Sequence, residues 1–178
     1  EEAFESAGQK FNRGSFIIRN VSARDLGKAA TELGLNAVAL ATSPSVRTHP
    51  ARAARVALMH TWINTQDEGW WRLALDQISV PFTYISTQDV TKEADLRSKF
   101  DVVLFPPVGR ASGQTIISGM PMYGNPIPWK TTELTPNIGK EDSTDDIRPG
   151  MGWSGMENLH KFVREGGRWK FKRHQIGG

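Results

Sequence analysis

The side chains best suited to chemistry lie between positions 60 and 68. His60 ends a short apolar run, and two adjacent carboxylates, Asp67 and Glu68, follow it along the chain. A histidine that is oriented by a carboxylate is a common general base in hydrolysis. His60, Asp67 and Glu68 are therefore the candidate catalytic residues, and they would make the chain a hydrolase of a small substrate.

The sequence offers no nucleophile to accompany this base. The closest approach to a Gly-x-Ser-x-Gly elbow is Gly152-Trp-Ser-Gly-Met, in which Ser154 is better explained as a helix N-cap. The carboxylates also have structural explanations, because Glu68 follows Thr65 at the capping-box spacing and Asp67 suits the positive end of a helix dipole. Both the catalytic and the capping interpretation stay open at this point.

The same stretch is well placed to bind a ligand. Residues 56–59 are apolar, as in a buried strand, and open α/β sheets bind ligands at the carboxyl ends of their strands. Aromatic side chains from a later segment add rings of the kind that recognise peptides, carbohydrates or other small molecules. The candidate ligand-binding residues are His60, Trp62, Asn64, Gln66, Asp67, Tyr123 and Trp129.

We expect His60, Trp62, Asn64 and Asp67 to lie at the carboxyl edge of the sheet, at least partly accessible to solvent. Alternatively, the loop rings pack together as a small satellite core. That second interpretation applies to Trp62, Trp129 and Trp153.

The sequence predicts neither a metal site nor a cofactor. Asp67 and Glu68 are adjacent, so on a helix they point in different directions and cannot easily share one ion. A second acidic group, Asp142, Asp145 and Asp146, lacks the glycine and the terminal glutamate of a calcium-binding loop. We expect this group to form a solvated acidic loop.

The elements around these residues alternate between strands and helices from Arg55 onward. The patterns predict strand 55–60, helix 67–79, strand 82–86, helix 92–99 and strand 101–105. A last helix is predicted to begin at an N-cap, Ser154, with Glu157 at the capping-box spacing, and to end at Gly166-Gly167. Buried faces are expected at Trp71, Ala74, Leu75 and Ile78, and at Met156, Leu159, Phe162 and Val163. The alternation predicts an α/β fold with a parallel sheet flanked by helices.

The first 54 residues read as a separate segment. An apolar stretch at 16–19, a helix that Ser22 caps through the spacing to Asp25, and an apolar run at 37–41 predict a βαβ unit. Residues 42–54 are a linker. The predicted organisation is an N-terminal βαβ segment and linker over 1–54 and one compact α/β domain over 55–178.

Residues 108–152 form an unusual segment of the second domain. They are rich in Gly, Pro, Thr and Asp, and a connection of this length is usually either functional or disordered. Tyr123 and Trp129 favour order, because disordered segments are poor in large apolar side chains. We therefore predict an ordered flap.

The end of the chain has the pattern of an edge strand. Trp169 and Phe171 alternate with Lys170 and Lys172, which predicts a half-exposed strand over 168–173. This strand either remains exposed and guarded by its lysines or pairs with the same strand of a second copy, which would make a homodimer.

Composition excludes several classes of protein. The 178 residues carry a formal charge of +3 and contain no cysteine, which excludes disulfides, thiolate zinc sites and cysteine nucleophiles. No stretch approaches the roughly 20 apolar residues of a membrane span. The basic residues are spread along the chain, so nucleic-acid binding is not expected. The acidic start lacks the layout of a signal peptide, and we expect the chain to be a section of a longer protein.

Several segments together resemble a known family. They are Arg-Val-Ala-Leu-Met-His-Thr-Trp from Arg55, Asp-Glu-Gly-Trp-Trp from Asp67, Val-Pro-Phe-Thr-Tyr-Ile-Ser from Val80, Asp-Val-Val-Leu-Phe-Pro-Pro from Asp101, and the run from Gly152 to Gly167. These segments resemble the region that follows the catalytic domain in some bacterial M14-type zinc carboxypeptidase-like proteins. That region is similar to a class I glutamine amidotransferase-like, flavodoxin-like domain, and the likeness extends over about residues 11–167.

The resemblance implies a flavodoxin-like sheet in an accessory or ligand-binding domain of an exported carboxypeptidase-like protein. The catalytic motifs of both families are absent, because none of the four histidines is followed three residues later by glutamate and the amidotransferase cysteine is missing. We therefore expect a non-catalytic accessory domain. The small-substrate hydrolase and a self-association module that acts through the C-terminal strand are the alternatives.

Overall fold

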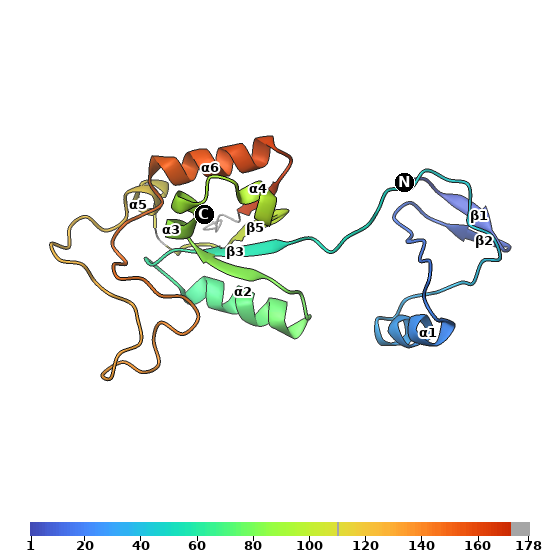
Figure 1. The fold of residues 1–178 in the computed structure, drawn as a ribbon, viewed down its shortest axis with the longest axis horizontal. Coiled ribbons are helices and arrows are strands. Elements are labelled where there is room, and N and C mark those ends of the chain that lie inside the picture. Colours follow the sequence, from blue (N-terminus) through green and yellow to red (C-terminus); the bar gives the residue numbers. More distant parts are fainter. Residues whose placement is uncertain (110, 172–178) are drawn as a thin grey trace, which may run out of the picture. The chain divides into compact units, whose positions relative to one another are not determined.

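The structure is a computed structural model that describes residues 1–109 and 111–171, and the chain folds as two compact units, Glu1–Ala53 and Ala54–Gly178 (Figure 1). In the first unit, β1 (Phe4–Ser6) and β2 (Gln9–Phe11) form an antiparallel hairpin, and α1 spans Ala23–Glu32. The rings of Phe4 and Phe11 stack with their centroids 4.8 Å apart.

The predicted βαβ unit is wrong, although its helix is correct. The Ser22 side chain caps α1 by accepting a hydrogen bond from the Asp25 backbone N–H, as predicted. Neither 16–19 nor 37–41 forms a strand. Phe16 and Ile18 are exposed, so this apolar run has no layer to pack against, and pairing and burial are what stabilise a strand.

The second unit contains the alternating elements. They are β3 (Val56–His60), α2 (Gln66–Gln77), β4 (Thr83–Ser86), α3 (Thr87–Lys92), α4 (Leu96–Lys99), β5 (Val102–Phe105), α5 (Gly113–Ser118), α6 (Gly152–Arg164) and β6 (Arg168–Phe171). Within the described part of this unit, four strands form a parallel sheet in the order β4-β3-β5-β6. The α/β fold with a parallel sheet flanked by helices is thus confirmed, and it is consistent with a flavodoxin-like fold.

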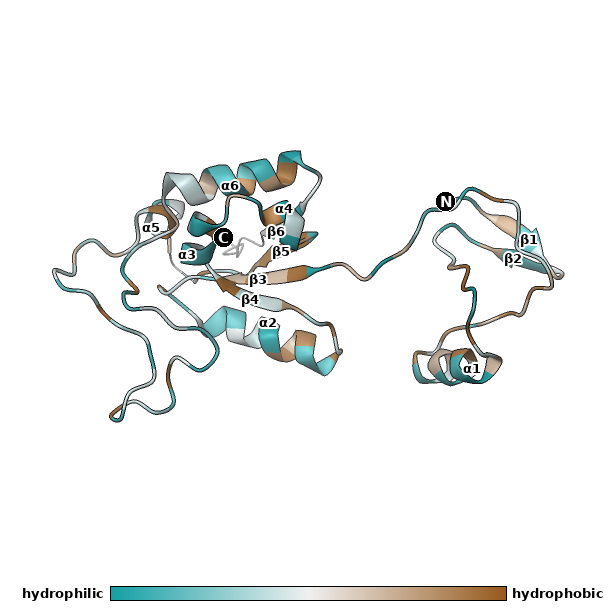
Figure 2. Cartoon of the chain, in the orientation of Figure 1, coloured by the Kyte–Doolittle hydropathy of each residue, from teal (hydrophilic) through white to brown (hydrophobic). Residues whose placement is uncertain are grey.

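Helices cover the two faces of the sheet unequally. The helix α2 lies on one face, and α6 with α3 and α4 lies on the other (Figure 1). The core forms on the α6 side, where Met59 and Val103 pack with Leu159 and Phe162, all of them fully buried. The colouring of Figure 2 shows apolar residues along β3 and β5 and mixed polarity along α2 and α6. As side chains alternate along a strand, Leu58 and His60 of β3 are directed toward the α2 side.

The helix α2 presents a different face to the sheet from the one predicted. Ala74 and Ile78 are exposed, Trp71 and Leu75 are partly buried, and Glu68 is buried. The inward face follows Glu68, Trp71, Arg72 and Leu75, at the i, i+3, i+4, i+7 spacing. The apolar pattern alone places this face incorrectly because two charged residues belong to it.

Two of the predicted capping boxes do not form. The Thr65 side chain makes no capping hydrogen bond, and α6 begins at Gly152, before Ser154. A capping box does form at Ser86 and Asp89, where it opens α3. The structure has two short helices, α3 and α4, in place of the single predicted helix 92–99.

The Gly- and Pro-rich segment 108–152 is only partly irregular. It contains α5, and the part between α5 and α6, residues 119–151, is called here the 119–151 loop. Its ends meet where Met120 N–H donates to the Arg148 carbonyl at 2.8 Å. Gly119 adopts a positive φ of 73° there, and a Cβ on this residue would lie 2.0 Å from the Arg148 carbonyl oxygen. The action of the segment as a flap remains a prediction.

The strand β6 is at one end of the described sheet, where it pairs with β5 in parallel. The prediction of an edge strand is therefore correct for Arg168–Phe171, whereas positions 172 and 173 lie outside the described residues. In the described residues, no helix has the length and apolar character needed to cross a membrane.

Candidate functional site

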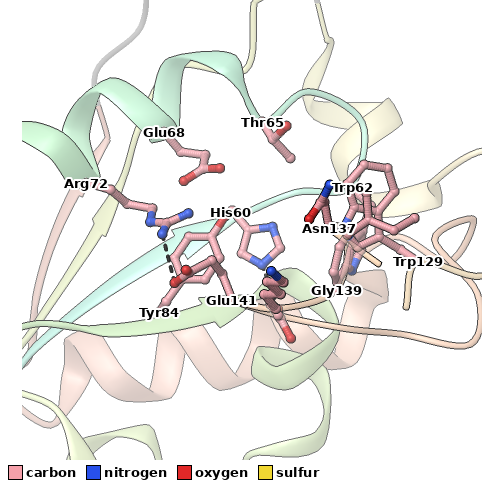
Figure 3. A pocket seen from close by; sticks show the side chains of 13 residues that line it. His60, Trp62, Thr65, Glu68, Arg72, Tyr84, Trp129, Asn137, Gly139 and Glu141 are labelled. Atoms are coloured by element: carbon pink, nitrogen blue, oxygen red, sulfur yellow. Dashed lines mark hydrogen bonds and ion pairs between the residues drawn. The ribbon is translucent and has the colours of Figure 1, made fainter. Parts of the chain in front are cut away.

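A pocket of about 260 Å³ lies at the carboxyl ends of β3 and β4, beside the start of α2 (Figure 3). The strands contribute His60 and Tyr84, and the β3–α2 connection and α2 contribute Trp62, Thr65, Glu68 and Arg72. The 119–151 loop completes the lining with Trp129 and residues 137–142. The position agrees with the general rule for ligand sites in open α/β sheets.

His60 is enclosed by protein atoms. The residue is 2% exposed, so the expectation that it is accessible to solvent is wrong. Its Nε2 lies 2.7 Å from Asp142 Oδ2, and its Nδ1 faces the Thr61 carbonyl oxygen at 3.4 Å. The ring stacks on Tyr84 with centroids 4.3 Å apart and meets Trp62 edge-on at 4.7 Å. Asp142, which the 119–151 loop brings over the end of β3, covers His60 together with Tyr84 and Trp62.

These contacts leave His60 poorly suited to act as a general base. A carboxylate only accepts hydrogen bonds, so Nε2 carries the hydrogen in the contact with Asp142. Nδ1 is directed at the protein backbone. Neither ring nitrogen is free to take a proton from a substrate in the pocket.

Glu68 is the most unusual polar side chain of the site. The residue is 6% exposed, and its Oε2 atom is buried without a hydrogen-bond partner among the described residues. Burial and a hydrogen bond with the Glu68 carboxylate raise the pKa of the Tyr84 hydroxyl well above its usual range. Tyr84 is therefore a neutral hydrogen-bond donor, and one oxygen of Glu68 remains without a partner.

Arg72 connects α2 to the 119–151 loop. Its Nη2 forms an ion pair with Glu141 Oε2 at 2.8 Å, and its guanidinium lies over the Tyr84 ring, 4.8 Å from the centroid. Figure 3 shows the guanidinium beside Tyr84 and the Glu68 carboxylate directed toward the pocket. The consecutive residues Glu141 and Asp142 thus hold the loop against α2 and β3.

Two tryptophans form the aromatic wall of the pocket. The Trp62 and Trp129 rings are 6.4 Å apart and tilted by 52°. Trp129 is held by its backbone, which exchanges two hydrogen bonds with Thr144. Trp62 is partly buried, and its Nε1 is buried without a partner in the described part of the chain.

The other predicted ligand-binding residues do not line this pocket. The Asn64 side chain accepts a hydrogen bond from the Gln66 N–H at 3.0 Å, which turns the chain into α2. Asp67 lies in the first turn of α2. Tyr123 is exposed, and its carbonyl accepts a hydrogen bond from Arg148 at 2.6 Å. Any role of these four residues in ligand binding remains a prediction.

The aspartates of the 119–151 loop are held by separate partners. Asp142 contacts His60, Asp145 pairs with Lys130 at 2.6 Å, and Asp146 pairs with Arg148 at 2.8 Å. The Arg148 side chain lowers the pKa of Asp146, and Lys130 lowers the pKa of Asp145. The expected solvated acidic loop is therefore wrong for Asp142. In residues 1–109 and 111–171, no group of three or more acidic or histidine side chains is arranged to hold a metal ion.

Sequence reasoning missed Arg72, Tyr84 and residues 137–142 as parts of the pocket. A signal existed for Arg72, which follows Glu68 by four residues and so shares its helix face. Tyr84 precedes the carboxyl end of its strand by two residues and so shares a sheet face with the last one. Residues 137–142 had no such signal, because they reach the site only through the path of the loop.

No protein-family model matches this chain, and neither a curated protein nor a solved structure is significantly similar to it.

Proposed function

We propose that the chain is a non-catalytic module that binds a small polar ligand in the pocket between β3, β4, α2 and the 119–151 loop. The observation that carries this proposal is a concave site with two tryptophan walls, Trp62 and Trp129, at the carboxyl edge of a parallel sheet. A volume of about 260 Å³ suits a ligand the size of an amino acid or a monosaccharide.

The polar groups of the pocket favour binding over catalysis. Both ring nitrogens of His60 lie next to protein oxygens, which disfavours the hydrolase alternative. The hydroxyls in the lining belong to Thr65 and Tyr84. The raised pKa of Tyr84 keeps its hydroxyl protonated, so it is a poor nucleophile.

The link to a carboxypeptidase-like protein rests on the resemblance of the chain segments described above. An accessory domain without zinc ligands or a nucleophilic cysteine is compatible with that resemblance. The pocket supports ligand binding, and the resemblance supports the assignment of the chain to a carboxypeptidase-like protein.

The experiment that tests the proposal combines binding with activity. A panel of amino acids, dipeptides, monosaccharides and disaccharides is titrated while tryptophan fluorescence is followed, in the wild type, in Trp129→Ala and in Trp153→Ala. Trp153 is exposed on α6 and does not line the pocket, so it is the matched control. We expect binding by the wild type and the control, and a loss of at least about tenfold in Trp129→Ala.

The same preparations are assayed with peptide, ester and amide substrates. We expect no turnover, including no zinc-dependent carboxypeptidase and no glutaminase activity. Turnover that disappears in His60→Ala would instead establish the hydrolase alternative. A panel without any Trp129-dependent binding would refute the proposed function.

Self-association is a second candidate function, and the position of β6 favours it. An edge strand presents backbone N–H and C=O groups that a second copy can pair with. Pairing through this edge would give a symmetric dimer.

A further inference from the structure

We propose that the ligand carries a protonated amine and that the Glu68 carboxylate is its binding partner. This inference rests on the proposed function, because it assigns the chemical class of the ligand in the same pocket. It is carried by a buried carboxylate oxygen that has no partner among the described residues.

A carboxylate with one oxygen left without a partner is energetically unfavourable at this degree of burial. Glu68 is 6% exposed, and glutamate is almost never so buried without a partner. Burial removes the water that normally stabilises the charge, and a cation with hydrogen-bond donors restores that stabilisation. A ligand that brings an ammonium group would supply both the charge and the missing donor.

The cations of the pocket do not provide this partner. Arg72 is engaged by Glu141 at 2.8 Å. Lys140 also lines the pocket, but it is exposed and makes no ion pair in the described residues. Of the acids, Asp142 contacts His60, so Glu68 is the carboxylate left for a ligand.

The aromatic wall favours the same class of ligand. The faces of tryptophan rings attract cations, and Trp62 and Trp129 stand together on one side of the pocket. A neutral sugar would also stack on these rings, but its hydroxyls would leave the charge of Glu68 without a counter-charge. An ammonium offers three donors and a charge in a small volume.

Two sources of this chemistry fit a pocket of about 260 Å³, the amino terminus of a short peptide and an amino sugar. Calorimetric titrations at pH 7 distinguish them with matched pairs. Alanyl-alanine amide is compared with its N-acetyl form, and glucosamine is compared with glucose. Glucose keeps the shape of glucosamine and lacks the charge, whereas the N-acetyl dipeptide amide lacks the charge and is larger by an acetyl group, so the sugar pair separates charge from size.

We expect one amine to bind at least about tenfold more tightly than its uncharged counterpart, because hydrogen bonds between charged groups are stronger than those between neutral groups. Glu68→Gln should abolish this preference. Glu157→Gln, an exposed carboxylate on α6, should retain it. The pair that shows the preference identifies the source of the amine.

The melting temperature of Glu68→Gln separates loss of the site from loss of the fold. The substitution removes a buried charge and keeps the shape of the side chain, so the melting temperature should equal or exceed that of the wild type. The side chain of the Glu68→Gln variant keeps an oxygen that can accept a hydrogen bond from the Tyr84 hydroxyl, so a lower melting temperature would mean that the second carboxylate oxygen of Glu68 already has a partner, and it would overturn the inference.

The remaining outcomes are also decisive. Equal binding of an amine and its uncharged counterpart, or an unchanged preference in Glu68→Gln, overturns the inference and leaves the proposed function standing. The absence of binding by all four compounds overturns it as well. The proposed function falls only if the wider ligand panel also gives no Trp129-dependent binding.

Discussion

The contact between His60 and Asp142 should determine whether the 119–151 loop stays closed over the pocket. The His60 side chain is 1% exposed, and Asp142 provides the acceptor for its Nε2 at 2.7 Å. Replacing Asp142 by alanine leaves this buried donor without a partner, which costs about 1–3 kcal/mol. The other oxygen of Asp142 accepts a hydrogen bond from the Ser143 N–H at 2.7 Å, and that bond is lost too.

We therefore expect Asp142→Ala to lower the free energy of unfolding of the second unit by about 2 kcal/mol. In urea this corresponds to a midpoint lower by about 1 M, for an m-value of about 2 kcal/mol/M. Amide hydrogen exchange should also quicken across 137–142, since this part of the loop loses one of its two side-chain contacts with β3 and α2, the other being the ion pair of Glu141 with Arg72.

The matched control is Asp145→Ala, in the same loop and with the same chemical change. Asp145 is 88% exposed in its ion pair with Lys130, and such surface pairs contribute little. The urea midpoint of unfolding and the amide hydrogen-exchange rates at 137–142 should therefore stay close to those of the wild type. If the two variants behave alike, the His60 contact does not hold the loop, and the reasoning about the closed pocket fails.

Three further predictions concern the core, the pH dependence and the edge of the sheet. Phe162→Ala should destabilise the second unit by about 3–5 kcal/mol in urea, because this side chain is fully buried, whereas Trp153→Ala on the same helix should have little effect. Arg148 lowers the pKa of Asp146, so the Asp146 carboxylate stabilises the fold above the unfolded-state pKa of about 4, and this contribution is lost as the pH falls. Asp146→Asn should therefore be less stable than the wild type at pH 7 in urea unfolding, and the difference should shrink under acid conditions. If β6 pairs with a second copy, sedimentation at high micromolar concentration should show a dimer that deletion of 168–178 converts to a monomer, and a wild-type monomer would rule this pairing out.

The strands of the parallel sheet could be predicted because their signal is local. Residues 57–59 of β3 are apolar and fully buried, so the apolar run is continuous, as in a strand that is covered on both faces. On the predicted inner face of α6, Leu159 and Phe162 are fully buried and Met156 is partly buried, whereas the prediction is wrong for Val163, which is exposed. A strand that is buried on both faces requires a continuous apolar run, and a helix that is buried on one face requires apolar residues at helical spacing, so both can be recognised in the sequence.

The closing contact of the site could not be predicted, because it joins residues far apart in the chain. His60 and Asp142 are separated by 82 positions, and the path of the 119–151 loop between them has no periodic pattern. That path is fixed by individual contacts, such as the hydrogen bond from Thr144 to the Gln88 side chain at 2.9 Å. Contacts of this kind depend on the folded backbone and leave no spacing that can be recognised beforehand.

Capping shows how tertiary contacts select among equal local signals. Ser22 with Asp25 and Thr65 with Glu68 have the same spacing, and a side-chain cap forms only at the first. The backbone differs at the two N-caps, because Ser22 has the extended conformation of a capping residue (φ −69°, ψ 143°) and Thr65 does not (φ −111°, ψ 1°), while Glu68 is buried beside Tyr84. A residue that a capping pattern predicts to be exposed is thus buried in the site.

The polar cluster at the end of β3 explains why α2 carries charged residues on its inner face. Leu58 lies two residues before His60 on the same face of β3 and is fully buried, so an apolar side chain can be accommodated between β3 and α2. Apolar replacements of buried ionic groups are often neutral or stabilising, so such groups are weak evidence for stability. The chain nevertheless places Glu68 and Arg72 opposite His60 and Tyr84, and one carboxylate oxygen is left without a partner. Because local rules of folding tend to be broken at functional sites, this departure from an apolar face is the strongest reason to look for a ligand there.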